Sequence, residues 1–298
     1  MNFDKKQTIA LLEVTFAVVV WGASFIATKV ALRDVSPVTV VWLRFAIGVA
    51  ILGFAVVIRR QLFKPGWKTL LYFALLGFVG ITFHQWLQSH GLVTAQASTT
   101  AWIVATTPIF MALLGWLFLK EKVDRYIVAG IGLATVGVVL VVSKGGLASL
   151  AAGQFGVPGD FLILISALNW AVFSVLSRRG LMKYTAAQMM FYVMGFGWFF
   201  VSILFFSGPG LAEISQLTQD GWYAIIFLGV ACSGLAYVFW YDALQAVPAS
   251  QVGAFLYLEP LVAVLVAFAI LGEPLILASL LGGAAILIGV WLVNRRRL

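Results

Sequence analysis

Polar and aromatic side chains interrupt several long apolar stretches of this chain. His84 and Gln88 lie four residues apart and share one face of a helix, with Gln85 beside them. Tyr237 and Tyr241 have the same spacing in a later stretch. Amide, imidazole and hydroxyl groups can hydrogen-bond the charged ends of a zwitterion, and rings can pack against its apolar part. These residue types predict recognition of a small amphipathic molecule.

Two tryptophans stand near the middle of apolar stretches. Trp and Tyr normally gather at the two membrane interfaces, a position that neither Trp21 nor Trp170 has. They indicate either bulky packing between helices or an aromatic wall around a central cavity. Ser24 follows Trp21 among small residues, and Ser174 lies one turn beyond Trp170, where its hydroxyl could donate a hydrogen bond to a substrate. All four are candidate substrate-binding residues.

Pro108 and Pro260 lie in the interior of two further apolar stretches. A proline removes one backbone N–H, so the carbonyl four residues earlier, on Val104 or Leu256, loses its usual donor. These carbonyls could bind polar groups of a substrate, or Thr side chains and water could satisfy them at a simple kink. The candidate binding residues near the two prolines are Trp102, Gln251, Phe255 and Tyr257, and Thr106 and Thr107 stand beside Pro108.

Glu259 is the one acidic residue expected near the middle of the bilayer. A charge there is costly, so this carboxyl must be protonated, paired or hydrated. It could couple transport to protons or hold a substrate ammonium; alternatively, it could hydrogen-bond a neighbouring helix and fix the bend at Pro260. A single histidine such as His84 is more often a satisfied structural group than a proton carrier.

The composition requires these residues to be positioned inside a membrane. Of the 298 residues, 62% are hydrophobic and 10% are charged, and the mean hydropathy is +1.05. Soluble domains have roughly 45–50% apolar and about 25% charged residues, so the surplus apolar surface must face lipid. The net charge of +8 does not indicate a nucleic-acid partner, because the basic residues lie in short loops between apolar runs.

The fold class is an all-α membrane protein of ten transmembrane helices with cytoplasmic N- and C-termini. The expected spans are 9–32, 38–58, 69–91, 97–119, 126–143, 160–178, 186–206, 221–243, 249–271 and 276–294. With the N-terminus inside, 15 of the 19 Lys and Arg residues fall in cytoplasmic segments. Lys29, Arg33 and Lys144 fall outside, and Arg44 falls within the second span. This asymmetry is the usual topology signal.

The chain repeats itself with a constant offset of 152 residues. The matching pairs include Ala97-Ser98 with Ala249-Ser250, Pro108 with Pro260, Glu121 with Glu273, and Gln85 with Tyr237. Trp21 pairs with Trp170 after a small shift of register. Each unit, 1–150 and 151–298, holds five spans, so the second unit has the opposite orientation in the membrane. Inverted repeats are frequent in secondary transporters and place the substrate site at their interface near the midplane.

These motifs resemble a known family. An early Trp-Gly-x-Ser, the Ala-Ser, Pro and Glu block of the fourth span and its echo ending Leu-Glu-Pro and Leu-Gly-Glu in the ninth look like the drug/metabolite transporter superfamily, EamA type. The resemblance covers nearly the whole chain. Within that family, the sequence is similar to the YddG-type exporters of aromatic amino acids. The resemblance implies an exporter, a role that spacing and composition do not show.

Other features indicate scaffold instead of chemistry. Glycines of the fifth and tenth spans predict close packing within the chain or between protomers. They are Gly130, Gly132, Gly137, Gly282, Gly283 and Gly289. Glu121 and Glu273 end the fourth and ninth spans and are expected to meet Lys residues or helix ends. Cys232 is the only cysteine and is expected to be a small packing residue.

We therefore expect a secondary transporter of the cell inner membrane that exports aromatic or apolar amino acids. A broader drug or metabolite exporter, which would also take quaternary ammonium compounds by cation–π contact, is the alternative. A channel or an intramembrane enzyme is a further alternative, although no His-Glu-x-x-His helix, Gly-x-Ser-x-Gly turn or ATP-binding loop is present. We expect no cofactor and no metal; the partners are a small-molecule substrate and lipid, and the oligomeric state is open.

Overall fold

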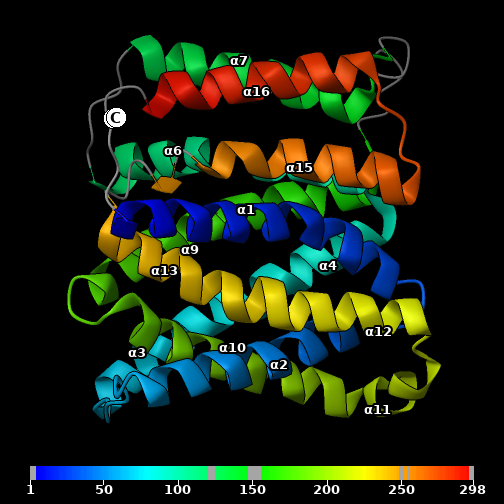
Figure 1. The fold of residues 1–298 in the computed structure, drawn as a ribbon. Coiled ribbons are helices and arrows are strands. Elements are labelled where there is room, and N and C mark those ends of the chain that lie inside the picture. Colours follow the sequence, from blue (N-terminus) through cyan, green and yellow to red (C-terminus); the bar gives the residue numbers. More distant parts are fainter. Residues whose placement is uncertain (1–4, 120–124, 147–155, 248–251, 254, 295–298) are drawn as a thin grey trace.

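The computed structural model describes residues 5–119, 125–146, 156–247, 252–253 and 255–294, and every regular element in these ranges is helical (Figure 1). The long helices run side by side in one bundle. The beginning of α1 and the end of α16 lie at the same end of this bundle. This arrangement agrees with two termini on one side of the membrane. That this side is the cytoplasm stays a prediction.

The first half of the chain contains seven α-helices and one π-helical segment within the described ranges. They are α1 (Lys5–Ala31), α2 (Pro37–Ile58), α3 (Trp67–Gly77), the π-helix η1 (Phe78–Phe83), α4 (His84–Thr94), α5 (Ala97–Val104), α6 (Thr107–Leu119) and α7 (Arg125–Ser143). The elements α3, η1 and α4 follow one another without a loop and form one continuous span.

The second half repeats this order with more irregular turns. Its elements are α9 (Pro158–Leu181), α10 (Ala186–Ser207), α11 (Gly210–Glu213), the 3-10 helix η2 (Ile214–Gln216), α12 (Gln219–Ile226), the π-helix η3 (Phe227–Leu235), α13 (Ala236–Ala246), the 3-10 helix η4 (Phe255–Leu258), α15 (Glu259–Val266), the π-helix η5 (Ala267–Leu271) and α16 (Leu277–Asn294). Here α12, η3 and α13 form the continuous span that corresponds to α3, η1 and α4.

Eight helices of the described part are long and apolar enough to cross a membrane, and the chain is a multi-pass membrane protein. They are Gln7–Ala31, Pro37–Ile58, Trp67–Thr94, Ala97–Leu117, Arg125–Ser143, Pro158–Leu181, Ala186–Ser207 and Gln219–Ala246. Two shorter apolar helices, Phe255–Leu271 and Leu277–Val293, lie where the ninth and tenth spans are expected. The all-helical class is thus confirmed for the described residues, and the count of ten spans stays a prediction.

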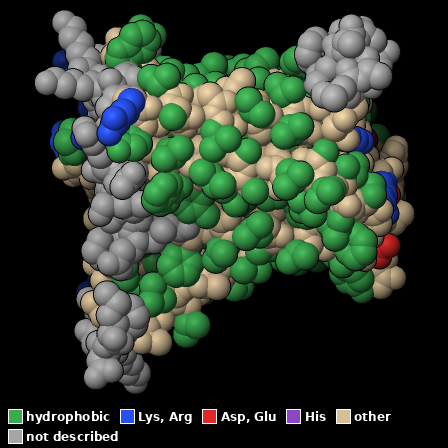
Figure 2. All heavy atoms as spheres, turned by 90° about the horizontal axis from the view of Figure 1, so that it is seen from above, with side chains coloured by type: hydrophobic (Ala, Val, Ile, Leu, Met, Phe, Trp, Pro, Cys, Tyr) green, Lys and Arg blue, Asp and Glu red, His purple; other side chains and the backbone are tan. Residues whose placement is uncertain are grey.

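The outer surface matches a lipid environment. Large apolar side chains point outward, among them Leu12, Phe54 and Trp67, which are 66%, 68% and 72% exposed. Figure 2 shows the face over α7 and α16, where apolar side chains cover the middle and Lys and Arg gather at the ends. Such a band without charges is what a hydrocarbon core about 30 Å thick requires.

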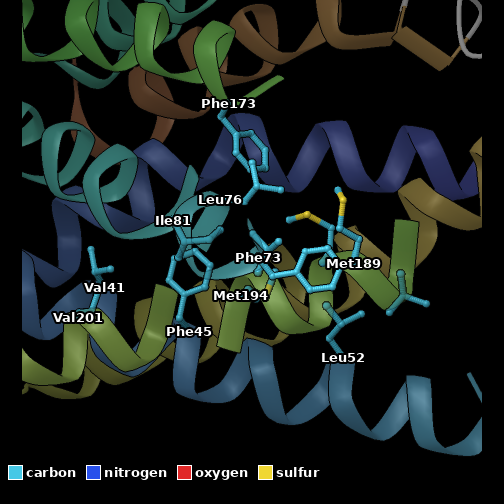
Figure 3. Close-up of a cluster of buried hydrophobic side chains, with 13 residues drawn as sticks. Val41, Phe45, Leu52, Phe73, Leu76, Ile81, Phe173, Met189, Met194 and Val201 are labelled. Atoms are coloured by element: carbon cyan, nitrogen blue, oxygen red, sulfur yellow. The ribbon is translucent and has the colours of Figure 1, made fainter. Parts of the chain in front are cut away.

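The largest buried cluster joins the two halves of the chain. Its side chains come from α2, α3 and η1 of the first half and from α9, α10 and α13 of the second (Figure 3). Phe45, Phe73 and Leu76 are fully buried in it, and Met189 and Met194 of α10 pack against them. The unbranched methionines fill the space between rings, so α10 is held firmly against α2 and α3.

Carboxylates bind helix beginnings across the two halves. Glu273, which follows η5, accepts hydrogen bonds from the backbone N–H groups of Ala97 and Ser98 at 2.8 and 3.0 Å, where α5 begins. Glu213 accepts one from the Ser36 N–H at 3.0 Å, next to the beginning of α2. A carboxylate at a helix beginning satisfies free N–H groups and complements the helix dipole. The helix-end role expected of Glu273 is confirmed, and Glu121 lies outside the described residues.

Glycines let α7 and α16 approach very closely. A Cβ on Gly130 would lie 2.5 Å from the carbonyl oxygen of Gly289, and a Cβ on Gly137 would lie 2.5 Å from that of Gly282. Without a hydrophobic driving force in lipid, such backbone proximity supplies the packing between helices. The expected close packing is therefore confirmed within the chain for Gly130, Gly137, Gly282 and Gly289, whereas Gly132 takes no part in it.

This packing predicts different effects for two substitutions in α7. Gly137→Ala places a methyl group against backbone that cannot move aside, so we expect a loss of stability of roughly 1–3 kcal/mol. Gly132→Ala is the matched control, since nothing lies within 4 Å of its Cβ position. Thermal unfolding in detergent measures both, and equal midpoints for the two variants would show that the close approach is not required.

Candidate functional site

Trp21 connects α1 to the span formed by η3 and α13. Its indole Nε1–H donates to the carbonyl of Cys232 at 3.0 Å. Its ring meets Tyr237 edge-on, with centroids 5.6 Å apart, and lies 5.2 Å from the ring of Trp240. Tyr241 follows one turn later, with its ring 6.3 Å from that of Tyr237. One aromatic contact between the two halves is therefore built around Trp21.

Trp170 of α9, in the second half, forms the corresponding contact with α4 of the first half. Its ring centroid lies 4.8 Å from that of His84. The Nδ1 atom of His84 is 3.2 Å from the carbonyl oxygen of Ser166, one turn before Trp170. Asn169 adds a hydrogen bond from its Nδ2 to the carbonyl of Val79, at 2.8 Å. The repeat partners Trp21 and Trp170 thus both contact a span of the opposite half.

Both contacted spans contain a π-helical segment. Shifting η1 (Phe78–Phe83) by the repeat offset gives residues 230–235, which lie inside η3 (Phe227–Leu235). A π-helical turn holds an extra residue, disturbs the regular backbone hydrogen bonding and is frequent at functional sites. In each segment one carbonyl, on Val79 or Cys232, accepts a side-chain N–H from the opposite half. Each π-helical segment is therefore stabilised by a side-chain donor from the opposite half, Asn169 for η1 and Trp21 for η3.

Arg44 lies beside these contacts and is buried within α2. Its Nε donates to Ser233 Oγ in η3 at 3.1 Å, and its Nη1 donates to Gln85 Oε1 in α4 at 3.4 Å. Arg44 is evident in the sequence only as a charge within the second span, and no sequence pattern marked Ser233 or Asn169 as a functional residue. A single arginine inside an apolar span is a strong signal, because such charges are rare and functional.

The two serines are engaged with their own helices. Ser24 Oγ donates to the Trp21 carbonyl at 2.6 Å, and Ser174 Oγ donates to the Trp170 carbonyl at 2.7 Å. Because their hydrogens already bind these carbonyls, the two hydroxyl groups could only accept a hydrogen bond from a substrate in this structure. Gln88 is buried one turn after His84, and its amide makes no hydrogen bond to the described residues.

The break expected at Pro108 is present between α5, which ends at Val104, and α6, which begins at Thr107. Thr107 Oγ1 donates to the Val104 carbonyl at 2.7 Å, so a threonine satisfies the group that the proline leaves open. In the second half, the 3-10 helix η4 precedes α15, and Pro260 stands in the first turn of α15.

Other candidates lie apart from these contacts. Trp102 is only 2% exposed and packs on Gly283 of α16, where a Cβ would lie 2.5 Å from the indole ring. Tyr257 packs against the same cluster as Trp102, and Phe255 packs against a cluster of α1 and α13. Gln251 lies outside the described residues. A small apolar pocket contains none of the candidates and is lined by Pro37, Val38, Val41, Thr82, Trp86, Val201 and Leu204.

Glu259 begins α15, where that helix touches α1. A Cβ on Gly22 would lie 2.7 Å from the Glu259 carbonyl oxygen, so only glycine allows this approach. The Glu259 side chain is partly buried and forms neither a hydrogen bond nor an ion pair with any described residue. A hydrogen bond to a neighbouring helix, one of the three roles considered above, is therefore not present in the described part of the chain.

The repeat partners Trp21 and Trp170 differ in one testable way. Trp21→Phe keeps a ring but removes the N–H that the Cys232 carbonyl accepts, so we expect a loss of stability of roughly 1–3 kcal/mol. Trp170→Phe is the control, since no hydrogen bond of its indole to a described residue is lost. Thermal unfolding of the two variants in detergent measures the difference; a midpoint for Trp21→Phe equal to that of the control would contradict the role of this hydrogen bond.

Comparison with known proteins extends these observations. The sequence profile described as the EamA-like transporter family matches residues 8–143 and 157–295. The chain is 30% identical over 291 residues to an uncharacterized transporter of Archaeoglobus fulgidus, covering 98% of both chains. It is 29% identical over 303 residues to a probable terminal-alkyne amino-acid exporter of Streptantibioticus cattleyicolor, covering 98% of this chain and 96% of the relative. A crystal structure of 22% sequence identity shares the fold, with a TM-score of 0.65 over 97% of this chain and 98% of the other.

Proposed function

Because the chain belongs to the EamA-like transporter family, we propose that it exports small amphipathic metabolites, foremost aromatic or apolar amino acids, by alternating access between its two halves. The resemblance to this family noted in the sequence is confirmed by the match over both halves. The expectation that the protein is a transporter and not an enzyme is confirmed by the same match and by its named relatives.

The observation that carries the proposal is the pair of aromatic contacts between the halves. Trp21 with Tyr237 and Trp170 with His84 bring rings from four spans to the junction of the two repeats. Gln85 and Gln88 add amide groups within the same stretch of α4. Rings suit the apolar part of an amino acid, and amides suit its charged end.

The setting in the membrane completes the proposal. Ten spans with both termini in the cytoplasm would place the contacts near the midplane, where inverted-repeat carriers bind their substrates. The inner membrane is the site of action in this proposal. The relative described as a probable terminal-alkyne amino-acid exporter supports an amino acid as the cargo. That protein aligns with nearly the whole of this chain.

A broader exporter of drugs and metabolites is the second candidate. The rings of Trp21, Tyr237 and Trp240 pack together in one aromatic cluster, whose faces would be the contact for a quaternary ammonium group. Aromatic faces attract such cations. Glu259, which has no partner among the described residues, would supply a compensating negative charge.

Transport into proteoliposomes tests the proposal directly. We expect saturable flux of labelled phenylalanine and tryptophan, accelerated by unlabelled amino acid on the opposite side, because a carrier must return its site after each cycle. Tetraphenylphosphonium serves as the cationic comparison for the broader exporter. Flux that never saturates would indicate a channel, and transport of the cation without either amino acid would favour the second candidate.

Glu259→Gln tests proton coupling. If the carboxyl of Glu259 carries the proton, the variant keeps exchange of amino acid between the two sides but loses stimulation by a pH gradient, by roughly tenfold or more. Exchange and gradient-driven flux are measured in the same liposome preparation, so each variant is its own control for folding. A variant that responds to the gradient as the wild type does excludes Glu259 as the coupling group.

A further inference from the structure

Arg44 is the only charged residue of α2 (Pro37–Ile58), a helix long enough to span the membrane. It stands seven residues after Pro37, about 10 Å along the helix axis. Its side chain is 5% exposed, and the ring of Phe45 lies 5.3 Å from its guanidinium carbon. The charge is therefore inside the bundle, shielded from lipid and nearly shielded from water.

The hydrogen bonds of Arg44 leave part of its guanidinium unused. The group carries five N–H donors. Nε donates to Ser233 Oγ at 3.1 Å and Nη1 donates to Gln85 Oε1 at 3.4 Å, and the described residues provide no acceptor for Nη2. Both acceptors are neutral, and the bond to Gln85 is long. Nη2 and the remaining hydrogen of Nη1 are available to a further acceptor.

No described carboxylate, Glu259 and Glu13 included, forms an ion pair or a hydrogen bond with Arg44. Asp242 pairs with Arg59, and Glu273 and Glu213 bind helix beginnings at the end of the bundle. Asp34 accepts hydrogen bonds from Thr218, and Asp160 accepts one from the Val157 N–H. Burial of an arginine among neutral partners is costly, so a cation kept in this position is expected to have a function.

The partners of Arg44 are neighbours of the two aromatic contacts. Gln85 follows His84, whose ring contacts Trp170, and Ser233 follows Cys232, whose carbonyl accepts the Trp21 N–H. An anion on the free donors of Arg44 would therefore lie close to the rings of both halves. An arginine fork binds a carboxylate through two parallel hydrogen bonds, which is the geometry that two adjacent free donors offer.

We propose that Arg44 binds the carboxylate of the transported molecule. The proposal rests on the proposed export of amino acids and narrows its substrate class to compounds that carry a carboxylate. It also disfavours purely cationic drugs, because they would meet the positive charge of Arg44, which has no ion-pair partner among the described residues. Arg44 thus decides between the two candidate functions.

Ligand binding to the purified full-length protein tests this role. The ligands are phenylalanine, phenethylamine, which lacks the carboxylate, and 3-phenylpropionate, which lacks the ammonium; their binding is followed by competition with labelled phenylalanine and by quenching of tryptophan fluorescence. We expect the wild type to bind the two carboxylates at least about tenfold more tightly than phenethylamine.

Variants separate binding from packing. Arg44→Gln should weaken the binding of phenylalanine and 3-phenylpropionate on the order of 10- to 100-fold. It should not weaken the binding of phenethylamine, because this cation no longer meets the positive charge of Arg44. Arg44→Lys keeps the charge without the fork and should give an intermediate loss. Arg33→Gln removes an exposed arginine after α1 and is the matched control, with binding expected to equal that of the wild type.

Three outcomes would overturn the proposal. Equal affinity of the wild type for phenylalanine and phenethylamine would remove the need for a carboxylate site, and this result requires no variant to fold. Equal weakening of all ligands by Arg44→Gln and Arg44→Lys would make Arg44 a packing residue only. If amino acids neither bind nor cross the membrane, the proposed export of amino acids is wrong. The carboxylate site is then tested with 3-phenylpropionate alone: weaker binding to Arg44→Gln than to the wild type supports the site, and no binding to the wild type overturns it.

Discussion

Inside a bilayer no water is available to satisfy backbone groups, so each irregular turn of a spanning helix needs a donor or acceptor from the protein itself. The π-helical segments η1 and η3 and the break before Pro108 are such turns. Asn169 donates to Val79, Trp21 donates to Cys232 and Thr107 donates to Val104. Two of these three donors come from the opposite half of the chain. The π-helical segments therefore depend on the packing of the two halves, because that packing brings the donors to their carbonyl groups.

The two aromatic contacts are related by the repeat but differ in chemistry. Trp21 meets a tyrosine and another tryptophan, whereas Trp170 meets a histidine and Phe173. A perfectly symmetric junction would treat both ends of a substrate alike. An amino acid has one apolar end and one charged end, so a junction with unlike sides fits it better than a symmetric one.

Local sequence predicted the features that local physics determines. The break near Pro108 follows from a missing N–H, and the apolar length of each helix follows from the thickness of the bilayer. The mid-span positions of Trp21 and Trp170 were enough to indicate that both stand at important contacts. No residue type marks Phe78–Phe83 or Phe227–Leu235 as π-helical, because the extra residue per turn depends on donors distant in sequence.

The other features of the site depend on tertiary contacts, which the sequence does not show. Arg44 was visible as a charge, but its relation to Ser233, 189 residues away, appears only when α2 and η3 pack together. Trp102 has the same residue type and a similar setting to Trp21, yet its ring fills the space over Gly283. Sequence pattern alone does not distinguish a tryptophan that packs against glycine from one that contacts a tyrosine across the halves.

A permanent positive charge within the bundle also makes the protein sensitive to voltage. Moving one elementary charge through a potential of 100 mV changes the free energy by about 2.3 kcal/mol. In the proposed alternating access, water would bring the buried groups electrically closer to the side on which the carrier is open, so Arg44 would cross part of the field at each reorientation. An interior that is negative would then favour the inward-open form of the empty carrier. A bound carboxylate without an ammonium would cancel that preference, whereas a zwitterionic amino acid, which has no net charge, would leave it unchanged. In the proposed export cycle, the potential of the cell would thus return the unloaded carrier to the side where its cargo is made.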